Sequence, residues 1–137
     1  GVPAGVMVAP LIPQLNDRDL ESILEACARA GATSAGWILL RLPREVAPMF
    51  RDWLSVHYPD RAAHVMSLLR DARGGRDYDA RFGERMRGRG VYAGLIERRF
   101  EIACRRLGLN VDREYAALDR SQFVPPPSDE GRQASLF

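Results

Sequence analysis

Two continuous apolar runs separated by one amphipathic stretch constrain the fold of this chain more than any other feature. The first run spans Gly5–Ile12 and the second spans Ser34–Leu42, and neither alternates between apolar and polar residues. Continuous runs of this kind are typical of strands that are covered on both faces of a parallel sheet. A strand, a helix and a second strand in this order form a βαβ unit. The sequence therefore predicts an α/β fold.

Proline, asparagine and glycine residues mark the expected ends of these elements. Pro10 and Pro13 lack the N–H that a sheet ladder needs, so we expect strand pairing to end near them. Asn16 is a suitable N-cap for the helix that follows, and Gly31 is a suitable stop for it. The second strand is expected to end at Pro43.

After Pro43 the apolar residues recur with helical spacing. The first stripe, which we expect to face the core, consists of Val46, Met49, Phe50, Trp53 and Leu54. A further helix is predicted after Pro59, and a long one from near Val91 to Gly108.

Two strands are too few to form a stable buried sheet. We therefore expect a missing upstream portion to supply more strands, and the absence of an initiator methionine agrees with a longer chain. Residues 1–58 are predicted to be the closing βαβα part of a (β/α) barrel, and residues 59–109 a helical C-terminal extension with an arginine-rich loop. Residues 110–137 lose apolar density and contain three consecutive prolines, which predicts an extended, mobile tail.

Positive charge is concentrated in the middle of the chain. All 20 basic residues are arginine, and the formal net charge is only +2. Residues 70–89, called here the arginine-rich segment, contain seven arginines interleaved with aromatic and acidic residues. Arginines and aromatic rings together can hold phosphates and stack on bases. The candidate nucleic-acid contacts are Arg73, Arg76, Tyr78, Arg81, Phe82 and Arg85. The alternative is a solvated loop whose arginines pair with its own carboxylates.

The two cysteines and two histidines do not form a recognisable metal site. Cys27 and Cys104 lie 77 positions apart, which fits neither a metal-binding pair nor a disulfide framework. We expect both to be core residues in a reducing, cytoplasmic protein. His57 and His64 are expected to be ordinary surface histidines. No apolar run approaches the roughly 20 residues of a membrane helix, so no membrane association is expected.

Three stretches of the chain carry a family resemblance. Residues Gly5–Asp17, with the sequence GVMVAPLIPQLND, resemble a late strand-to-helix segment of radical S-adenosylmethionine (SAM) proteins. The most similar group is the one related to spore photoproduct lyase, often described as DNA repair photolyase-like. Gly31–Pro43 and Arg73–Gly83, followed by Tyr92 and Phe100, resemble the next regions of one bacterial subfamily.

The resemblance implies a partial (β/α) barrel in which a [4Fe–4S] cluster cleaves S-adenosylmethionine to a 5′-deoxyadenosyl radical. Such a cluster is held by three cysteines of a CxxxCxxC motif, and this sequence contains no such motif. Gln14 is a smaller departure, because the family pattern usually has glycine there. The cluster and SAM are therefore expected only in the full-length protein, and this chain by itself is predicted to be inactive, with no catalytic residue of its own.

Ligand-facing groups of barrels lie at the carboxyl ends of the strands. This rule places Pro10, Pro13, Asn16 and Arg41 at the predicted mouth. Arg41 follows an apolar run, so its charge needs a carboxylate, a carbonyl or a bound ligand. Ligand or substrate contact, a structural ion pair and simple exposure all stay open for Arg41. Helix capping and ligand contact stay open for Asn16.

The last five residues resemble the peptide by which bacterial repair proteins bind the DNA sliding clamp. Leu136 and Phe137 would enter an apolar groove while Gln133 forms hydrogen bonds beside it, although Ala134 replaces the usual leucine. The alternative is a tail that folds back on its own domain.

Three functional hypotheses follow. The first is the C-terminal part of a radical SAM enzyme that acts on DNA or a nucleotide-like substrate. The second is a non-catalytic module that binds DNA and the sliding clamp. The third is a scaffold whose arginines only increase solubility.

Overall fold

The computed structural model describes residues 3–111, 121 and 123–124 of the chain, and the fold is mixed α/β. The strands are β1 (Gly5–Leu11) and β2 (Ser34–Leu39). A 3₁₀ turn, η1 (Asp17–Asp19), precedes helix α1 (Leu20–Arg29). The remaining helices are α2 (Val46–His57), α3 (Pro59–Asp71) and α4 (Gly90–Leu107). In the described part of the chain, none of the helices is long and apolar enough to cross a membrane.

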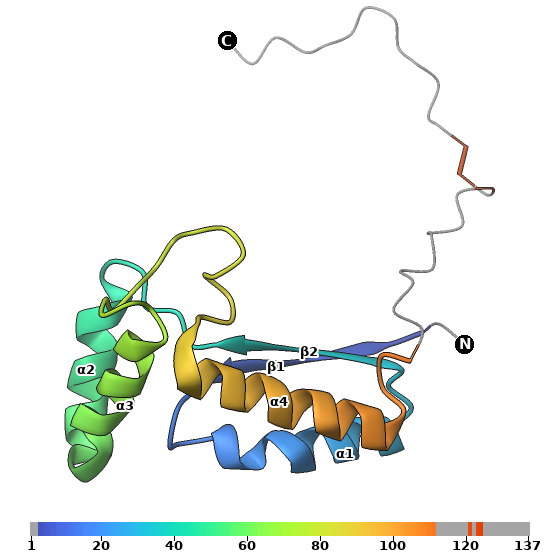
Figure 1. Cartoon of the computed structure of the whole chain (residues 1–137), viewed down its shortest axis with the longest axis horizontal. Helices are drawn as coiled ribbons and strands as arrows, with labels where there is room; N and C mark the ends of the chain where they lie inside the picture. Colours follow the sequence, from blue (N-terminus) through green and yellow to red (C-terminus); the bar gives the residue numbers. More distant parts are fainter. Residues whose placement is uncertain (1–2, 112–120, 122, 125–137) are drawn as a thin grey trace, which may run out of the picture.

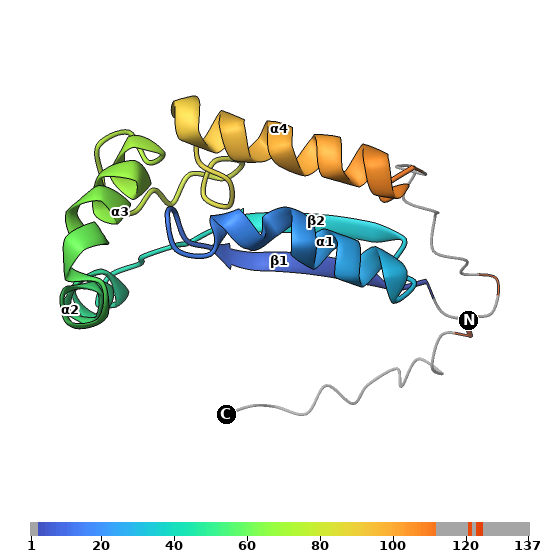
Figure 2. The same cartoon turned by 90° about the horizontal axis from the view of Figure 1, so that it is seen from below.

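The two strands form a parallel sheet, and in the described part of the chain α1 and α4 run along one and the same face of it (Figures 1 and 2). Val8 lies opposite Trp37, and both side chains belong to the buried apolar cluster. On the other face Met7 is 59% exposed and lies against Gly36. The α2–α3 pair lies beyond the carboxyl ends of the strands (Figure 1).

Strand pairing ends near Pro10 and Pro13, as the sequence predicts, and it passes Pro10 by one residue. β1 continues to Leu11, with a shift in register between Val8 and Leu11. The Leu11 carbonyl accepts a hydrogen bond from the Leu40 N–H at 2.9 Å. Proline lacks a backbone N–H donor. A register shift that leaves the Pro10 nitrogen unpaired allows strand pairing to resume at Leu11.

The outer edge of β2 is closed by groups that do not belong to a strand. The Asn110 side-chain amide accepts a hydrogen bond from the Ala35 N–H at 2.9 Å and donates one to the Ala35 carbonyl at 3.0 Å. Nearer the carboxyl end, the Leu39 N–H donates to the Met86 carbonyl at 2.9 Å. An unpaired strand edge is a template for further pairing, and these contacts block it.

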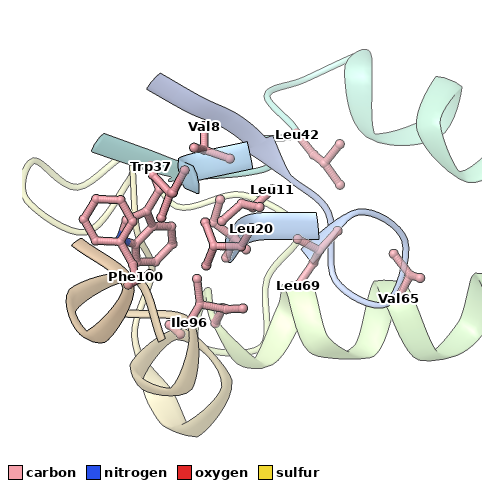
Figure 3. Packing of buried hydrophobic residues seen from close by; sticks show 14 of the residues in the cluster. Val8, Leu11, Leu20, Trp37, Leu42, Val65, Leu69, Ile96 and Phe100 are labelled. Carbon is pink, nitrogen blue, oxygen red and sulfur yellow. The ribbon is translucent and has the colours of Figure 1, made fainter. Parts of the chain in front are cut away.

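One apolar cluster extends through the described residues. It contains Leu11 of β1, Leu20 of α1, Leu69 of α3 and Ile96 of α4, each almost fully buried (Figure 3). Ile96 and Phe100 are buried residues of α4, and the helix ends before Gly108, the stop that the sequence predicts, which has the left-handed conformation. A glycine at this position satisfies the last carbonyls of a helix at little steric cost.

The apolar stripe of α2 is largely exposed, which corrects the prediction that it faces the core. Leu54 is buried, but Met49 is 67% exposed and Trp53 is 40% exposed. The helix packs against α3, away from the sheet. Trp53 stacks on Phe50 at a centroid distance of 5.7 Å and contacts the Tyr58 ring at 5.3 Å. The periodicity shows which residues share a face and does not show whether a partner covers that face.

The role of Asn110 at the β2 edge can be tested by Asn110→Gly. Glycine keeps the positive φ of 60° at this position and removes both hydrogen bonds to Ala35. We expect the free energy of unfolding to fall by about 1–3 kcal/mol, measured by urea denaturation. Asn110→Asp keeps the acceptor and loses the donor, so its loss should be intermediate. A change below about 0.5 kcal/mol for the glycine variant would contradict the role.

Candidate functional site

Arg73 is buried, so the prediction that it contacts nucleic acid is wrong. Only 2% of its surface is exposed. Its guanidinium group donates hydrogen bonds to the Glu84 and Arg85 carbonyls at 3.0 and 2.9 Å. It also donates to the Leu39 and Leu40 carbonyls at 3.4 and 3.2 Å. The planar, delocalised guanidinium group suits such a set of acceptors better than an ammonium group would.

These contacts join the arginine-rich segment to the end of the sheet. Leu39 is the last residue of β2 and Leu40 follows it, and the carbonyls of both accept hydrogen bonds from Arg73. This explains why β2 ends at Leu39 and not at the predicted Leu42. Burial, and then the neighbouring Arg41 charge, lower the pKa of Arg73. Because its guanidinium group binds four backbone carbonyls, Arg73 has a structural role.

Arg41 lies at the carboxyl end of β2, where the sequence places it, and faces the arginine-rich segment. Its guanidinium group donates to the Tyr78 hydroxyl at 2.8 Å and lies 5.6 Å from the centre of the same ring. A second nitrogen lies 3.8 Å from the Met86 sulfur. Within the described residues it forms no ion pair with a carboxylate, and its Nε has no hydrogen-bond partner. The structural ion pair, one of the possibilities that the sequence leaves open for Arg41, is therefore not observed among the described residues.

Of the three other predicted mouth residues, Pro10 lies in β1, and Pro13 and Asn16 lie in the turn that follows it. Asn16 makes no side-chain capping bond, and α1 begins only at Leu20 after η1. Its side chain accepts a hydrogen bond from the Ile12 N–H at 2.7 Å and donates one to the Pro10 carbonyl at 3.0 Å. Pro13 is buried and Pro10 is exposed. Asn16 therefore fixes the turn, because its amide is satisfied by the backbone before the helix begins.

Several arginines of the segment pair with acidic residues, as the alternative reading of the sequence expects. Arg81 binds both oxygens of Asp79 and also contacts Glu84 at 2.9 Å. These hydrogen bonds from Arg81 hold the pKa of the Asp79 carboxyl well below its usual range. Asp77 is paired with both Arg51 and Arg70. The charges of these arginines are locally compensated.

Arg76, Phe82 and Arg85 remain as the candidate nucleic-acid contacts of the segment. Phe82 is 90% exposed, and the Arg85 guanidinium carbon lies 5.3 Å from the centre of its ring. Arg76 is exposed, and neither arginine has an ion-pair partner among the residues that the structure describes. Tyr78 belongs instead to the Arg41 contact. An exposed aromatic ring beside an arginine without an ion pair is suited to stacking on a base and contacting phosphate.

A polar cluster between α1 and α4 was not anticipated from the sequence. The Tyr92 hydroxyl donates to Asp17 at 2.7 Å, and burial followed by this bond raises the pKa of Tyr92. Arg99 binds both oxygens of Glu21 at 2.8 and 2.6 Å, which lowers the pKa of Glu21. An open groove of about 760 Å³ beside the cluster is lined in part by His64. Tyr92 and Asp17, like Arg99 and Glu21, are more than 70 positions apart in the sequence, so no local pattern predicts these contacts.

The cysteines do not fit an iron–sulfur cluster. Cys27 is half-buried in α1 and Cys104 is buried in α4. Among the described residues, no group of three or more histidine, cysteine or acidic side chains could hold a metal ion. A [4Fe–4S] cluster requires three converging thiolates, and two distant ones cannot supply them.

Comparison with known proteins adds no assignment. No protein-family model, curated protein or solved structure matches the chain. The predicted clamp-binding residues Gln133, Leu136 and Phe137 lie outside the described residues.

The anchoring role of Arg73 predicts the effect of Arg73→Met. Methionine keeps most of the length but leaves four carbonyls without their donor, so the free energy of unfolding should fall by about 2–4 kcal/mol. The arginine-rich segment should also become more sensitive to limited trypsin digestion at Arg81 and Arg85. The control is Arg76→Met, an exposed position that should change stability by less than about 0.5 kcal/mol. Equal stability and digestion of the two variants would contradict the anchoring role.

Proposed function

We propose that this chain forms the last strands of a larger, partial α/β barrel and presents the carboxyl ends of β1 and β2 to an anionic substrate. The observation that carries the proposal is the difference between the two edges of the sheet. The outer edge of β2 is closed by Asn110 and Met86, whereas β1 has no strand beside its outer edge in the part of the chain that the structure describes. A further strand can therefore join at β1 and not at β2.

The uncovered face of the sheet supports the same proposal. Parallel sheets are normally covered on both faces, and α1 and α4 cover only one here. The other face carries the exposed Met7 beside Gly36, at which an added Cβ would lie 2.9 Å from the Met7 methyl group. In a barrel the helices lie outside and the opposite face of each strand points inward. The uncovered apolar face then becomes the barrel interior.

The charge at the end of the sheet suggests the class of substrate. Arg41 is a half-buried cation just beyond the carboxyl end of β2. Its charge lies close to the buried Arg73, whose pKa is lowered by burial and by the charge of Arg41. Barrel enzymes bind substrate at this end of their strands. A phosphate or carboxylate group would supply the counter-charge that Arg41 lacks among the described residues.

The resemblance of Gly5–Asp17 to radical SAM proteins supplies the proposed reaction class. The residues of this chain do not fit the cluster, so the [4Fe–4S] group and SAM are assigned to an upstream part of the protein. The contribution of this chain is to complete the sheet and to hold Arg41, Tyr78 and Asn16 around the mouth. The substrate proposed for the whole protein is DNA or a nucleotide-like molecule.

The exposed ring of Phe82 favours a second candidate function, a non-catalytic nucleic-acid-binding module. Phe82 and Arg85 form an exposed cation–π pair, and Arg76 adds an uncompensated charge nearby in the sequence. Binding through such a surface requires no cluster and no upstream strand. The contact of Gln133, Leu136 and Phe137 with a sliding clamp belongs to this candidate and stays a prediction.

The barrel proposal is tested with the protein encoded by the reading frame extended upstream by about 200 residues, since a barrel has about 250. After anaerobic reconstitution with iron and sulfide, it should bind a cluster and convert SAM to 5′-deoxyadenosine. The present chain, treated identically, should do neither. Amide protons of β1 should exchange more slowly in the extended protein. Absence of cluster and cleavage contradicts the radical chemistry, and unchanged β1 exchange contradicts the barrel.

The nucleic-acid candidate predicts that Phe82→Ala weakens single-stranded DNA binding about tenfold, because one stacked base contributes about 1–3 kcal/mol. Fluorescence anisotropy with a labelled oligonucleotide measures the affinity. Val91→Ala is the matched control, since Val91 is an exposed apolar residue outside the segment. Arg76→Ala should also reduce the slope of log affinity against log salt by about 1. Equal affinities of the wild type and the Phe82 variant would contradict a stacking role.

A further inference from the structure

The outer face of α4 carries a row of exposed residues that the functions proposed above do not use. Side chains that follow one another at alternating separations of four and three residues lie along one side of a helix. Five exposed residues of α4 have this spacing, and we call them the outer stripe: Val91, Leu95, Arg98, Ile102 and Arg105.

The outer stripe lies opposite the face by which α4 joins the core. Ala93, Ile96 and Phe100 are buried. Within the described part of the chain, α4 packs against α1, α3 and β2. Figure 2 shows α4 along one margin of the described structure, with α1 and the sheet on its inner side. Packing within the chain therefore does not explain the valine, leucine and isoleucine of the outer stripe.

The apolar members of the outer stripe are strongly exposed. Val91 is 94% exposed, Leu95 is 54% exposed and Ile102 is 56% exposed. Single exposed apolar residues are normal on a protein surface, whereas several in one contiguous patch are typical of an interaction site. Arg98 stands between Leu95 and Ile102, and the stem of an arginine side chain is itself apolar. The outer stripe thus presents one continuous apolar line.

Gly94 lies next to this line, and the described residues do not explain a glycine there. Its φ is not positive, and an added Cβ would meet no atom within 4 Å outside its own stretch of helix. Alanine would favour the helix more, so glycine at this open position weakens it. A missing side chain does allow another backbone to approach closely. Gly94 therefore favours a second helix over a lipid surface as the occupant of this face.

The charges around the outer stripe indicate which kind of helix fits. Arg98, Arg105 and Arg106 are exposed, and none of them forms an ion pair with a described residue. The exposed Glu101 offsets one of these three charges. The face therefore keeps a net positive charge, and a partner that carries carboxylates is complementary to it.

We propose that the outer stripe of α4 is a docking surface for an acidic amphipathic helix of another protein. The apolar side of that helix covers the apolar line, its backbone comes closest at Gly94, and its carboxylates pair with Arg98 and Arg105. Anchors three and four residues apart are the ones that helix recognition uses. Nucleic acid would meet the cations but would leave the apolar line uncovered. The inference goes beyond both functions proposed above and depends on neither.

The test uses the full 137-residue chain and a synthetic peptide of about 20 residues, which is comparable to α4 in length. The peptide has leucine and alanine along one side of a helix and glutamate on the other side. A scrambled peptide of the same composition is the control. Fluorescence anisotropy of the labelled peptides should show saturable binding that is at least about tenfold tighter for the amphipathic peptide. The amide resonances that shift should be those of the outer stripe and Gly94.

Gly94→Ala separates docking from helix stability. The urea midpoint of unfolding should rise, because alanine is the better helix former. Peptide binding should weaken roughly tenfold, because the added methyl group holds the two helices apart. A glycine with only a structural effect would leave the affinity for the peptide unchanged, and that result would contradict the close approach at Gly94.

Two further variants test the apolar line and the charge. Leu95→Ala should weaken peptide binding roughly tenfold, whereas Val56→Ala, at an exposed apolar position of α2, should leave it unchanged. Arg98→Glu should weaken binding about fivefold at low salt, and this difference should shrink as salt is added. Arg44→Glu makes the same change in net charge at another exposed position and should have no effect.

Other classes of partner are tested with the same variants, with phosphatidylserine-containing vesicles and with a duplex oligonucleotide. Weaker peptide binding by the Gly94, Leu95 and Arg98 variants, with both control variants unchanged, supports the proposal. Equal binding of the amphipathic and scrambled peptides overturns it, and so do equal affinities of the wild type and these three variants. Binding of vesicles or duplex through the same residues, without binding of the peptide, overturns it in favour of that ligand.

Discussion

The buried Arg73 guanidinium group is the interaction on which the rest of the structure depends. It joins two carbonyls at the end of β2 to two carbonyls of the arginine-rich segment. Because these carbonyls are occupied, the strand ends there and the segment folds back against it. The fold-back brings Tyr78 and Met86 to Arg41, and places Met86 beside the edge of β2. A buried charge is costly unless its hydrogen bonds are satisfied, so the segment has little freedom to detach.

The arginine-rich segment consequently has two kinds of arginine with different roles. Arg73 and Arg81 are held by carbonyls and carboxylates and maintain the shape of the loop. Arg76 and Arg85 have no ion pair within the described residues; Arg76 is exposed, and the half-buried Arg85 lies beside the exposed ring of Phe82. The same residue type thus supplies a rigid support and an exposed cationic surface. This arrangement agrees with a scaffold that positions a binding surface at the end of a sheet.

The βαβ order, the helices and the stop at Gly108 could be predicted because they depend on local periodicity and on backbone preferences. The functional geometry could not. Arg73 and Arg76 are indistinguishable in sequence, since only the fold decides which one is buried. The Asn110 amide meets Ala35 across 75 positions, and no local pattern announces that contact. The buried indole N–H of Trp37 has no hydrogen-bond partner among the described residues, and only atomic positions can show this.

The closed edge of β2 also determines how copies of this chain could associate with one another. Among the described residues, Asn110 and Met86 occupy that edge and no strand lies beside β1, so two such molecules would extend the sheet by placing β1 against β1. Two identical strands paired in this way are related by a two-fold axis and run antiparallel. The resulting four-stranded sheet would end in a capped β2 on each side. Pairing through the described strands would therefore stop at a dimer.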